Sequence, residues 1–219
     1  MTERSNFDTE AGPLFRAARE PEGVKRAVVR FHRRVDEVLD ATIRGHDVKI
    51  DCARGCSYCC SMQVDVSPYE AFTLAAWVRT HFDAGRLAAA IARLRHNDER
   101  TREVGMEARK RMNLACAFLG DDGACTVYEA RPASCRRFHS TRLATCVASY
   151  ENPADDSIES PMHAAVAHNA QVIVTQARHA ARDAGLDADP VDMNRALLEA
   201  LENPKAWRRW RDGKKPFVG

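Results

Sequence analysis

The feature that most restricts this chain is a ten-residue stretch, DCARGCSYCC at 51–60, which holds half of its cysteines. They are Cys52, Cys56, Cys59 and Cys60. A single cysteine is often an ordinary small core residue, but such a dense group is typical of a metal site. A thiolate is costly to bury alone, whereas a metal ion or an iron–sulfur cluster compensates the charge of several thiolates at once. We therefore expect this stretch to supply metal ligands.

The other cysteines form a second, distant series. They are Cys116, Cys125, Cys135 and Cys146. The turn-forming GDDG at 120–123 and the helix-breaking Pro132 make this segment irregular. All eight cysteines are candidate metal ligands, although Cys146 lies outside the tightest spacing. We expect the two series to meet in one irregular metal-binding lobe, because the helical insert between them, at about 67–111, can fold back.

Much of the remaining chain has helical patterns. Residues 21–44 carry an apolar stripe and begin with Pro21, and SPYE at 67–70 has the composition of a capping box. Residues 86–111 contain no proline and are rich in alanine, arginine and glutamate, which predicts one long helix.

Two further helices are expected towards the C-terminal end. Ser160 and Pro161 have the composition of a helix start, and Gly185 would close that helix. Asp189 and Pro190 precede a last helix, which Pro204 would stop. No run alternates as strands do, and only VDV at 64–66 could be extended. The sequence predicts an all-α chain.

Length and composition predict one domain. A chain of 219 residues, 45% of them hydrophobic, can build a sizeable core. We expect a single helical metal-binding domain over 1–204, with its cysteine-cluster core at about 52–146, and a basic aromatic tail over 205–219. Trp207 and Trp210, three residues apart, would pin this tail to the domain, although such a tail could also bind an anionic surface.

The sequence also predicts a compartment and a class of partner. The N-terminal residues lack the apolar core of a signal peptide, and no apolar run approaches the roughly 20 residues that span a bilayer. We expect a cytoplasmic protein without a transmembrane segment, in which dense cysteines bind metal rather than form disulfides. Because the formal net charge is only +2, nucleic acid is not an expected partner. The expected partners are a metal ion or cluster and a protein.

The segment VYEARPASCRRF at 127–138 surrounds Cys135 with residues that suit a thiolate site. Arg131, Arg136 and Arg137 can offset thiolate charge, because a guanidinium is permanently charged and rich in donors. Tyr128 and Phe138 can exclude water from the sulfurs. The alternative is an ordinary surface turn with ion pairs.

Two nearby residues have less definite roles. Glu129 could pair with Arg131 or orient a donor of the site. His139, four residues beyond Cys135, is expected to face solvent rather than to bind metal.

A short pattern in the first cysteine stretch points to radical chemistry. Cys52, Cys56 and Cys59, with Tyr58 before the third cysteine, resemble the signature of the radical S-adenosylmethionine superfamily, in which three thiolates hold a [4Fe–4S] cluster. That superfamily houses its chemistry in a barrel of alternating strands and helices. The sequence of this chain does not alternate between strand and helix patterns, which argues against the resemblance.

A longer pattern joins C-x3-C-x2-CC to a downstream C-x-F-L and G-x-C-x-V-Y-E-x-R-P-x-x-C-R-x-F, over about 52–138. This pattern resembles the YkgJ-type cysteine-cluster family of zinc- or iron-chelating domains. The matching residues beyond the first four cysteines are Cys116, Phe118, Leu119, Gly123, Cys125, Tyr128, Glu129, Arg131, Pro132, Cys135, Arg136 and Phe138. The resemblance implies a bound zinc ion or iron-containing centre. A related cysteine pattern in the flagellin lysine N-methylase implies methyl transfer.

Spacing does not decide between zinc and iron. Zinc prefers four ligands, so eight cysteines could form two such sites. Only Cys56 and Cys59 form the paired knuckle typical of zinc fingers, and adjacent Cys59 and Cys60 favour an iron–sulfur cluster such as [4Fe–4S]. The preferred function is therefore an iron–sulfur, or else zinc, protein with a redox, sensing or metal-handling role.

Two functions of other classes stay open. One is a cluster-dependent enzyme, acting by methyl transfer or by radical S-adenosylmethionine chemistry. The sequence contains no glycine-rich nucleotide loop in a strand–turn–helix context and no H-E-x-x-H motif that would support catalysis. The other is a structural zinc domain that presents helices to a protein partner, which would need only four of the cysteines.

Overall fold

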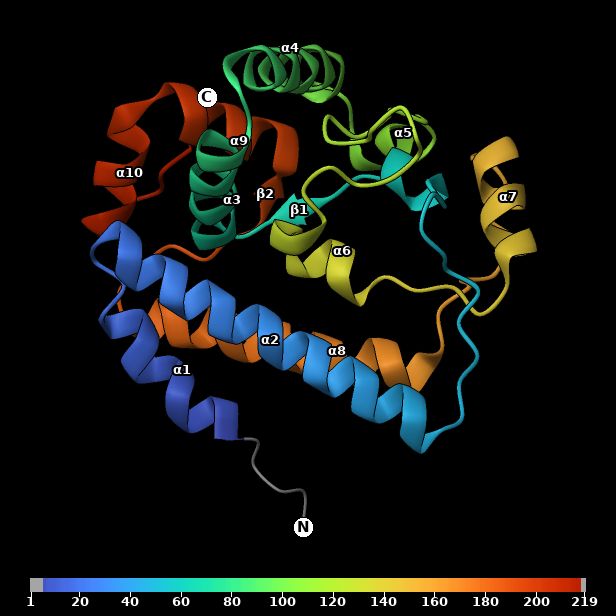
Figure 1. Cartoon of the computed structure of the whole chain (residues 1–219), viewed down its shortest axis with the longest axis horizontal. Coiled ribbons are helices and arrows are strands. Elements are labelled where there is room, and N and C mark those ends of the chain that lie inside the picture. The colour runs from blue at the N-terminus through green and yellow to red at the C-terminus, as the bar shows by residue number, and fades with distance from the viewer. Residues whose placement is uncertain (1–5, 218–219) are drawn as a thin grey trace.

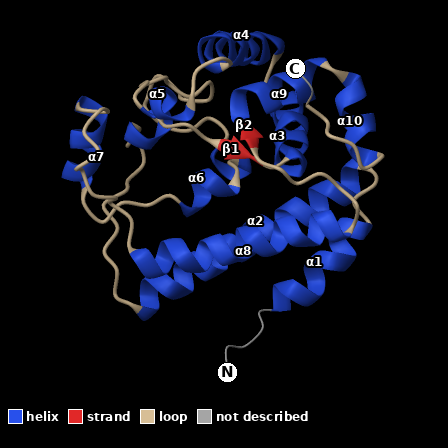
Figure 2. Ribbon diagram, turned by 180° about the vertical axis from the view of Figure 1, so that it is seen from behind, coloured by secondary structure: helices blue, strands red, loops and turns tan. Residues whose placement is uncertain are grey.

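The structure is a computed structural model in which residues 6–217 are described, and this part of the chain is mainly helical (Figure 1). The longer helices are α1 (Asn6–Arg16), α2 (Pro21–Gly45), α3 (Pro68–His81), α4 (Ala84–Thr101), α8 (Ala164–Asp183), α9 (Met193–Glu202) and α10 (Pro204–Arg211). The shorter ones are α5 (Met106–Lys110), α6 (Ala133–Arg137) and α7 (Leu143–Glu151), with single 3-10 turns η1 (Tyr58–Ser61) and η2 (Tyr128–Ala130). Two strands, β1 (Asp65–Val66) and β2 (Val191–Asp192), complete the elements (Figure 2). The predicted all-α class is confirmed.

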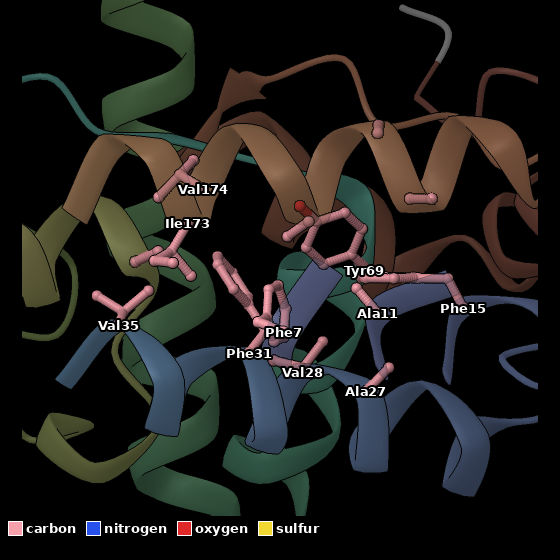
Figure 3. Packing of buried hydrophobic residues seen from close by; sticks show 14 of the residues in the cluster. Phe7, Ala11, Phe15, Ala27, Val28, Phe31, Val35, Tyr69, Ile173 and Val174 are labelled. Carbon is pink, nitrogen blue, oxygen red and sulfur yellow. The ribbon is translucent and has the colours of Figure 1, made fainter. Parts of the chain in front are cut away.

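Helices α1, α2 and α8 form one layer, in which α2 and α8 lie side by side along their lengths (Figures 1 and 2). Their shared core holds Phe7, Phe15, Phe31 and Tyr69, all at most 1% exposed. The Tyr69 ring makes edge-on contacts with Phe15 and Phe31, at centroid distances of 4.9 and 6.1 Å, and Figure 3 shows these rings meeting between the helices. The apolar stripe predicted over 21–44 lies on the buried face of α2.

A second core lies between α3, α4 and α9. It contains Leu74 and Val78 of α3, Leu94 of α4 and Leu197 of α9, all buried. Antiparallel pairing of β1 with β2, Asp65 with Asp192 and Val66 with Val191, attaches the chain before α3 to the chain before α9. This core therefore connects residues just after the first cysteines with residues near the C-terminal end.

A buried carboxylate connects the two cores to the cysteine segments. Ser67 and Glu70 form the predicted capping box of α3. Glu70 also accepts hydrogen bonds from His32 Nε2 of α2 at 3.0 Å and from the Ala133 amide of α6 at 2.7 Å. Burial alone would raise the pKa of Glu70, but the His32 and amide donors overcome burial and lower it. The carboxylate is thus an ionised junction between three helices.

The prediction of one continuous helix over 86–111 is wrong, because α4 ends at Thr101 and α5 begins only at Met106. The end of α4 is held against α9: Asn97 donates to Asn194 at 3.3 Å, and Asp98 pairs with Arg195 at 3.3 Å. Gly105, a poor helix former, lies in the gap and directly precedes α5.

The starts of α8 and α9 also differ from the prediction. Helix α8 begins at Ala164 after His163 and not at Ser160, and Pro161 instead accepts a backbone hydrogen bond from Thr141 at 2.9 Å. Helix α9 begins at Met193, because the residues before it pair as β2. The ends predicted for these helices, at Gly185 and before Pro204, are confirmed.

The tail packs on the helical body. Pro204 is the first residue of α10, and Trp210 is fully buried. Its indole nitrogen donates to the Asp187 carbonyl at 2.7 Å, and both tryptophans contact the Phe72 ring. The i, i+3 spacing of Trp207 and Trp210 therefore places both indoles on the domain, as predicted. In the described part of the chain, no helix has the length and apolarity to cross a membrane.

Candidate metal centre

The two cysteine segments lie against each other. The Cys116 amide donates to the Cys60 carbonyl at 2.7 Å, and the Asp51 amide donates to the Ser140 carbonyl at 2.8 Å. The Ser140 amide in turn donates to the Cys52 sulfur at 3.2 Å. Main-chain hydrogen bonds thus join parts of the chain that are more than fifty residues apart in sequence. The predicted lobe of two distant segments is present.

Two glycines allow the loops of these segments to touch. Gly55 and Gly123 both have positive φ, 88° and 74°. A β-carbon on Gly123 would lie only 2.8 Å from the Gly55 carbonyl oxygen, closer than side-chain atoms pack. Glycine is needed here for both the backbone angle and the close approach. The contact brings the loop before Cys56 against the loop before Cys125.

Seven of the eight cysteines line one cavity of about 840 Å³. They are Cys52, Cys56, Cys59, Cys60, Cys116, Cys125 and Cys135. All eight thiols are free of disulfide bonds. Cys146, on α7, does not line the cavity, but its thiol acts electrostatically on that of Cys52.

The lining thiols are unequally coupled. One group, which we call the thiol quartet, has each member within electrostatic range of the other three: Cys59, Cys116, Cys125 and Cys135. Its members come from both cysteine segments. Cys52 interacts instead with Cys56, Cys59 and Cys146. Cys59 therefore lies where the two groups meet.

Burial favours the protonated form of the thiols in the quartet. It raises the pKa of Cys116 to about 11, and it also raises the pKa values of Cys125 and Cys135. For Cys59, hydrogen bonding to the Cys60 side chain and then burial raise the pKa far above its ordinary value. Neighbouring thiols also raise the pKa values of Cys116, Cys125 and Cys135, since two thiolates repel. A cation between them would reverse this balance by stabilising the thiolates.

The side chains are not arranged as a finished coordination shell. Among the residues that the structure describes, no three histidine, cysteine, aspartate or glutamate side chains are close enough together to hold one metal ion. The donor chemistry nevertheless fits a thiophilic metal, because seven cysteines line one space. Which of them ligate stays a prediction.

Arg131 is the cation that acts electrostatically on most of the thiol quartet. Its charge lowers the pKa values of Cys59, Cys125 and Cys135, against the larger effect of burial. The guanidinium lies 3.9 Å from the centre of the exposed Tyr128 ring, and its buried Nε has no hydrogen-bond partner among the described residues. Arg131 is thus free to face an anionic centre.

Two other residues near Cys135, Arg136 and Glu129, do not line the cavity. Arg136 does not face the thiols, since it pairs with Asp36 at 2.7 Å and donates to the carbonyls of Glu129 and Arg131. Glu129 is exposed and contributes its main chain. Tyr128 is 59% exposed, and its ring lies under the Arg131 guanidinium; Tyr128 and Phe138 both line the cavity, as residues that exclude water from the sulfurs would.

The expectation that His139 faces solvent is wrong. It is 6% exposed; its Nδ1 lies 3.0 Å from the Arg137 carbonyl, and its Nε2 accepts from the His163 amide at 3.0 Å. Because Nε2 accepts, the proton belongs on Nδ1, and both ring nitrogens are engaged. His139 therefore ties the chain after Cys135 to the start of α8.

Several lining residues had no signal in the sequence. They are Asn97, Arg109, Gln171, Arg178, Met193 and Asn194, which come from four helices outside the cysteine segments. Arg109 is 5% exposed, and its Nε lacks a hydrogen-bond partner among the described residues. Only the folding of α4, α5, α8 and α9 around the cysteines places these side chains at the cavity.

Fold and site together define a helical protein with a cavity of free thiols. A family model described as "putative zinc- or iron-chelating domain" matches residues 51–160, half of the chain, and the chain belongs to this family. The matched range covers both cysteine segments and α3 to α7. No curated protein and no solved structure matches the chain in the comparisons made.

Proposed function

We propose that this protein holds a thiolate-ligated metal centre in the cavity, an iron–sulfur cluster in preference to zinc, and serves a redox, sensing or metal-handling role. The observation that carries the proposal is the meeting of seven free thiols from two hydrogen-bonded segments around one space. Membership of a zinc- or iron-chelating family supports the same chemistry.

The thiol quartet is the proposed main ligand set. Its four thiols are within electrostatic range of one another, they come from both segments, and four thiolates suit either a cluster or a zinc ion. Cys52, Cys56, Cys60 and Cys146 are proposed as additional ligands, at a second site or by exchange. Arg131 would offset the negative charge of the loaded centre.

Two features favour an iron–sulfur cluster over zinc. A cavity of about 840 Å³ is far larger than one zinc ion needs. The thiols also exceed the four of a structural zinc site, which counts against a purely structural zinc domain that presents helices to a partner. When bound, a cluster would supply one-electron chemistry, whose potential depends on burial and on charges such as that of Arg131.

An enzyme is the second candidate. Its supporting observation is again the cavity, whose volume falls in the range of small-molecule sites, about 300–1,000 Å³. A substrate could therefore lie beside the metal centre, as methyl transfer or radical S-adenosylmethionine chemistry would require.

Anaerobic purification followed by iron, zinc and acid-labile sulfide analysis tests the proposal. We expect iron and sulfide together, with broad thiolate-to-iron absorbance near about 400 nm. Stoichiometric zinc in a colourless protein would exclude the iron–sulfur form. Protein without bound metal, even after reconstitution, would contradict the metal centre altogether.

Serine substitutions test the ligand set. Cys125→Ser and Cys135→Ser should each lower the metal content strongly, because each removes a member of the thiol quartet. Cys146→Ser is the comparison variant, since this cysteine lies off the cavity wall. An equal loss in all three variants would show that the main ligand set extends to α7.

A further inference from the structure

Two arginines, one from α6 and one from α8, line the cavity. Arg137 is the last residue of α6, two positions after Cys135, and Arg178 lies on α8. Val174 and Gln171 also line the cavity, four and seven residues before Arg178, so a single face of α8 is turned to it. The cavity thus has two arginines from α6 and α8 in addition to its thiols.

The two guanidiniums lack a counter-charge. Among the side chains that the structure describes, no carboxylate lies within ion-pair distance, 4.0 Å, of either one. Arg137 makes no hydrogen bond through its side chain in the described part, and Arg178 reaches only the Ser67 hydroxyl, at 3.4 Å from its Nε. The charge of Arg178 acts on Arg137 and repels it. Both terminal nitrogens of each arginine remain available as donors.

Such a pair is expensive to maintain without a ligand. Partly buried charges lose hydration, and like charges raise each other's energy. An oxyanion between them would remove both costs and accept several charge-assisted hydrogen bonds, for which the planar guanidinium is well suited.

We propose that Arg137 and Arg178 form a binding subsite for the carboxylate or phosphate group of a small organic molecule that lies in the cavity. The rest of the molecule would extend along Val174 towards the thiols, since all line the same space. The inference deepens the proposed function, because the anion would bind beside the metal centre and supply its substrate, co-ligand or signal. Arg131 acts on the thiol quartet, and Arg109 lies within electrostatic range of Asp65 and Asp192, so neither is needed for the subsite.

Titration of the protein as isolated, with inorganic phosphate and separately with succinate at constant ionic strength, tests the subsite. We expect a saturable rise in the thermal unfolding midpoint with at least one of the two anions, whereas chloride gives none. The more tightly bound anion identifies the preferred group. If neither anion raises the midpoint more than chloride does, the subsite is refuted.

Matched variants locate the effect. Arg178→Gln should raise the dissociation constant of the anion about tenfold, which is the usual effect of losing one charged hydrogen bond. Arg137→Gln should have the same effect. Arg137→Lys should give an intermediate value, because it keeps the charge but loses the planar fork. Arg26→Gln, at an exposed position of α2, should bind as the wild type does. Wild-type affinity in the Arg137→Gln, Arg178→Gln double variant would overturn the proposal.

Metal analysis of the same samples separates this proposal from the first. Arg137 is close to Cys135 in sequence, so a loss of metal in its variant could have a second cause. Arg178 is on α8, far in sequence from every cysteine. Normal metal content with weakened anion binding in Arg178→Gln supports the subsite. Anion binding that is unchanged in this variant contradicts it, whatever metal is present.

Discussion

The layer of α1, α2 and α8 and the cysteine lobe are ordered by different means. The layer buries large side chains such as Phe7, Phe15 and Phe31 in direct contact across helices. The lobe has few buried apolar residues, Phe118 and Val127 among them, and is connected by backbone hydrogen bonds and a glycine contact. The layer has the means to be stable alone, whereas the lobe lacks them.

This difference indicates that the two regions owe their stability to different sources of free energy. A fully buried aliphatic or aromatic side chain contributes about 1.5–3 kcal/mol, so the layer needs no cofactor. In a metal site, the free energy of metal binding is also folding free energy, and it is available only when the thiols are deprotonated. The lobe should therefore depend on the metal, and the layer should not.

Metal removal should have the largest effect, because a structural thiolate metal site contributes about 10–16 kcal/mol of apparent binding free energy. After chelation, or in a Cys56→Ser, Cys125→Ser double variant, we expect most of the helical circular dichroism to remain. Residues 45–66 and 112–146 should lose protection in hydrogen exchange and become sensitive to protease.

Two outcomes would break the comparison in opposite ways. If all helices melt together on chelation, the metal site belongs to the main core. If both segments keep their protection without metal, the thiols do not hold the lobe together, and a reactive-thiol or catalytic role gains support.

A cavity in the helical layer should have the next largest effect. Phe31→Ala removes a fully buried ring and should lower the free energy of unfolding by about 3–5 kcal/mol, measured by denaturant titration. Val29→Ala on the same helix, where the side chain is 48% exposed, is the matched control and should change it by less than about 0.5 kcal/mol. Metal content per folded molecule should stay the same in both.

Glu70 tests the connection between the two regions. Glu70→Gln leaves an amide NH₂ facing a donor and should cost about 1–3 kcal/mol near neutral pH. Since the folded-state pKa of Glu70 is lowered, the contribution of the carboxylate is complete above the unfolded value of about 4.3. This contribution is lost as the pH falls through the folded-state pKa. The stability difference between wild type and variant should therefore shrink in acid.

The exposed Glu20, which makes no capping hydrogen bond, provides the control. Glu20→Gln should leave the stability at neutral pH unchanged. A Glu70→Gln variant with a constant deficit from neutral to strongly acidic pH would contradict an ionised carboxylate at the junction.

The loop contact should have a smaller effect. Gly123→Ala requires a left-handed backbone with a β-carbon near the Gly55 carbonyl, and should cost about 1–2 kcal/mol. Metal affinity should fall with it, because the contact brings the two cysteine loops together. Arg54→Gln removes only an exposed ion pair to Asp122 in the same two loops, and should cost less than about 0.5 kcal/mol. Equal effects of the two changes would show that the glycine contact has no special role.

Features with local causes were the predictable ones. The stripe of α2 and the capping box at Ser67 and Glu70 depend on neighbours within a few residues, so the sequence was enough. The break after Thr101 was missed because it depends on contacts of Asn97 and Asp98 with α9, about a hundred residues away. Helix α1 contains Pro13, and its burial of Phe7 and Phe15 against α2 and α8 is a tertiary effect.

The same distinction holds at the site. Cysteine density pointed to the cavity, because the first four cysteines lie together in the chain. The burial of His139 depends on the His163 amide, and the position of Arg178 depends on the packing of α8 against α6, neither of which has a local pattern. Arg136 was misassigned because its partner Asp36 lies a hundred residues earlier on α2.

The pairing of β1 with β2 has a consequence for the order of events during protein synthesis. This pairing positions α9, whose Met193 and Asn194 form part of the cavity wall. The ribosome completes the thiol quartet at Cys135, yet α9 is complete only at Glu202. Translation proceeds at about 5–20 residues per second, so roughly 3 to 13 seconds pass between the synthesis of Cys135 and the completion of α9. During this interval a metal ion or an assembly factor has open access to the nascent site, and so has an oxidant.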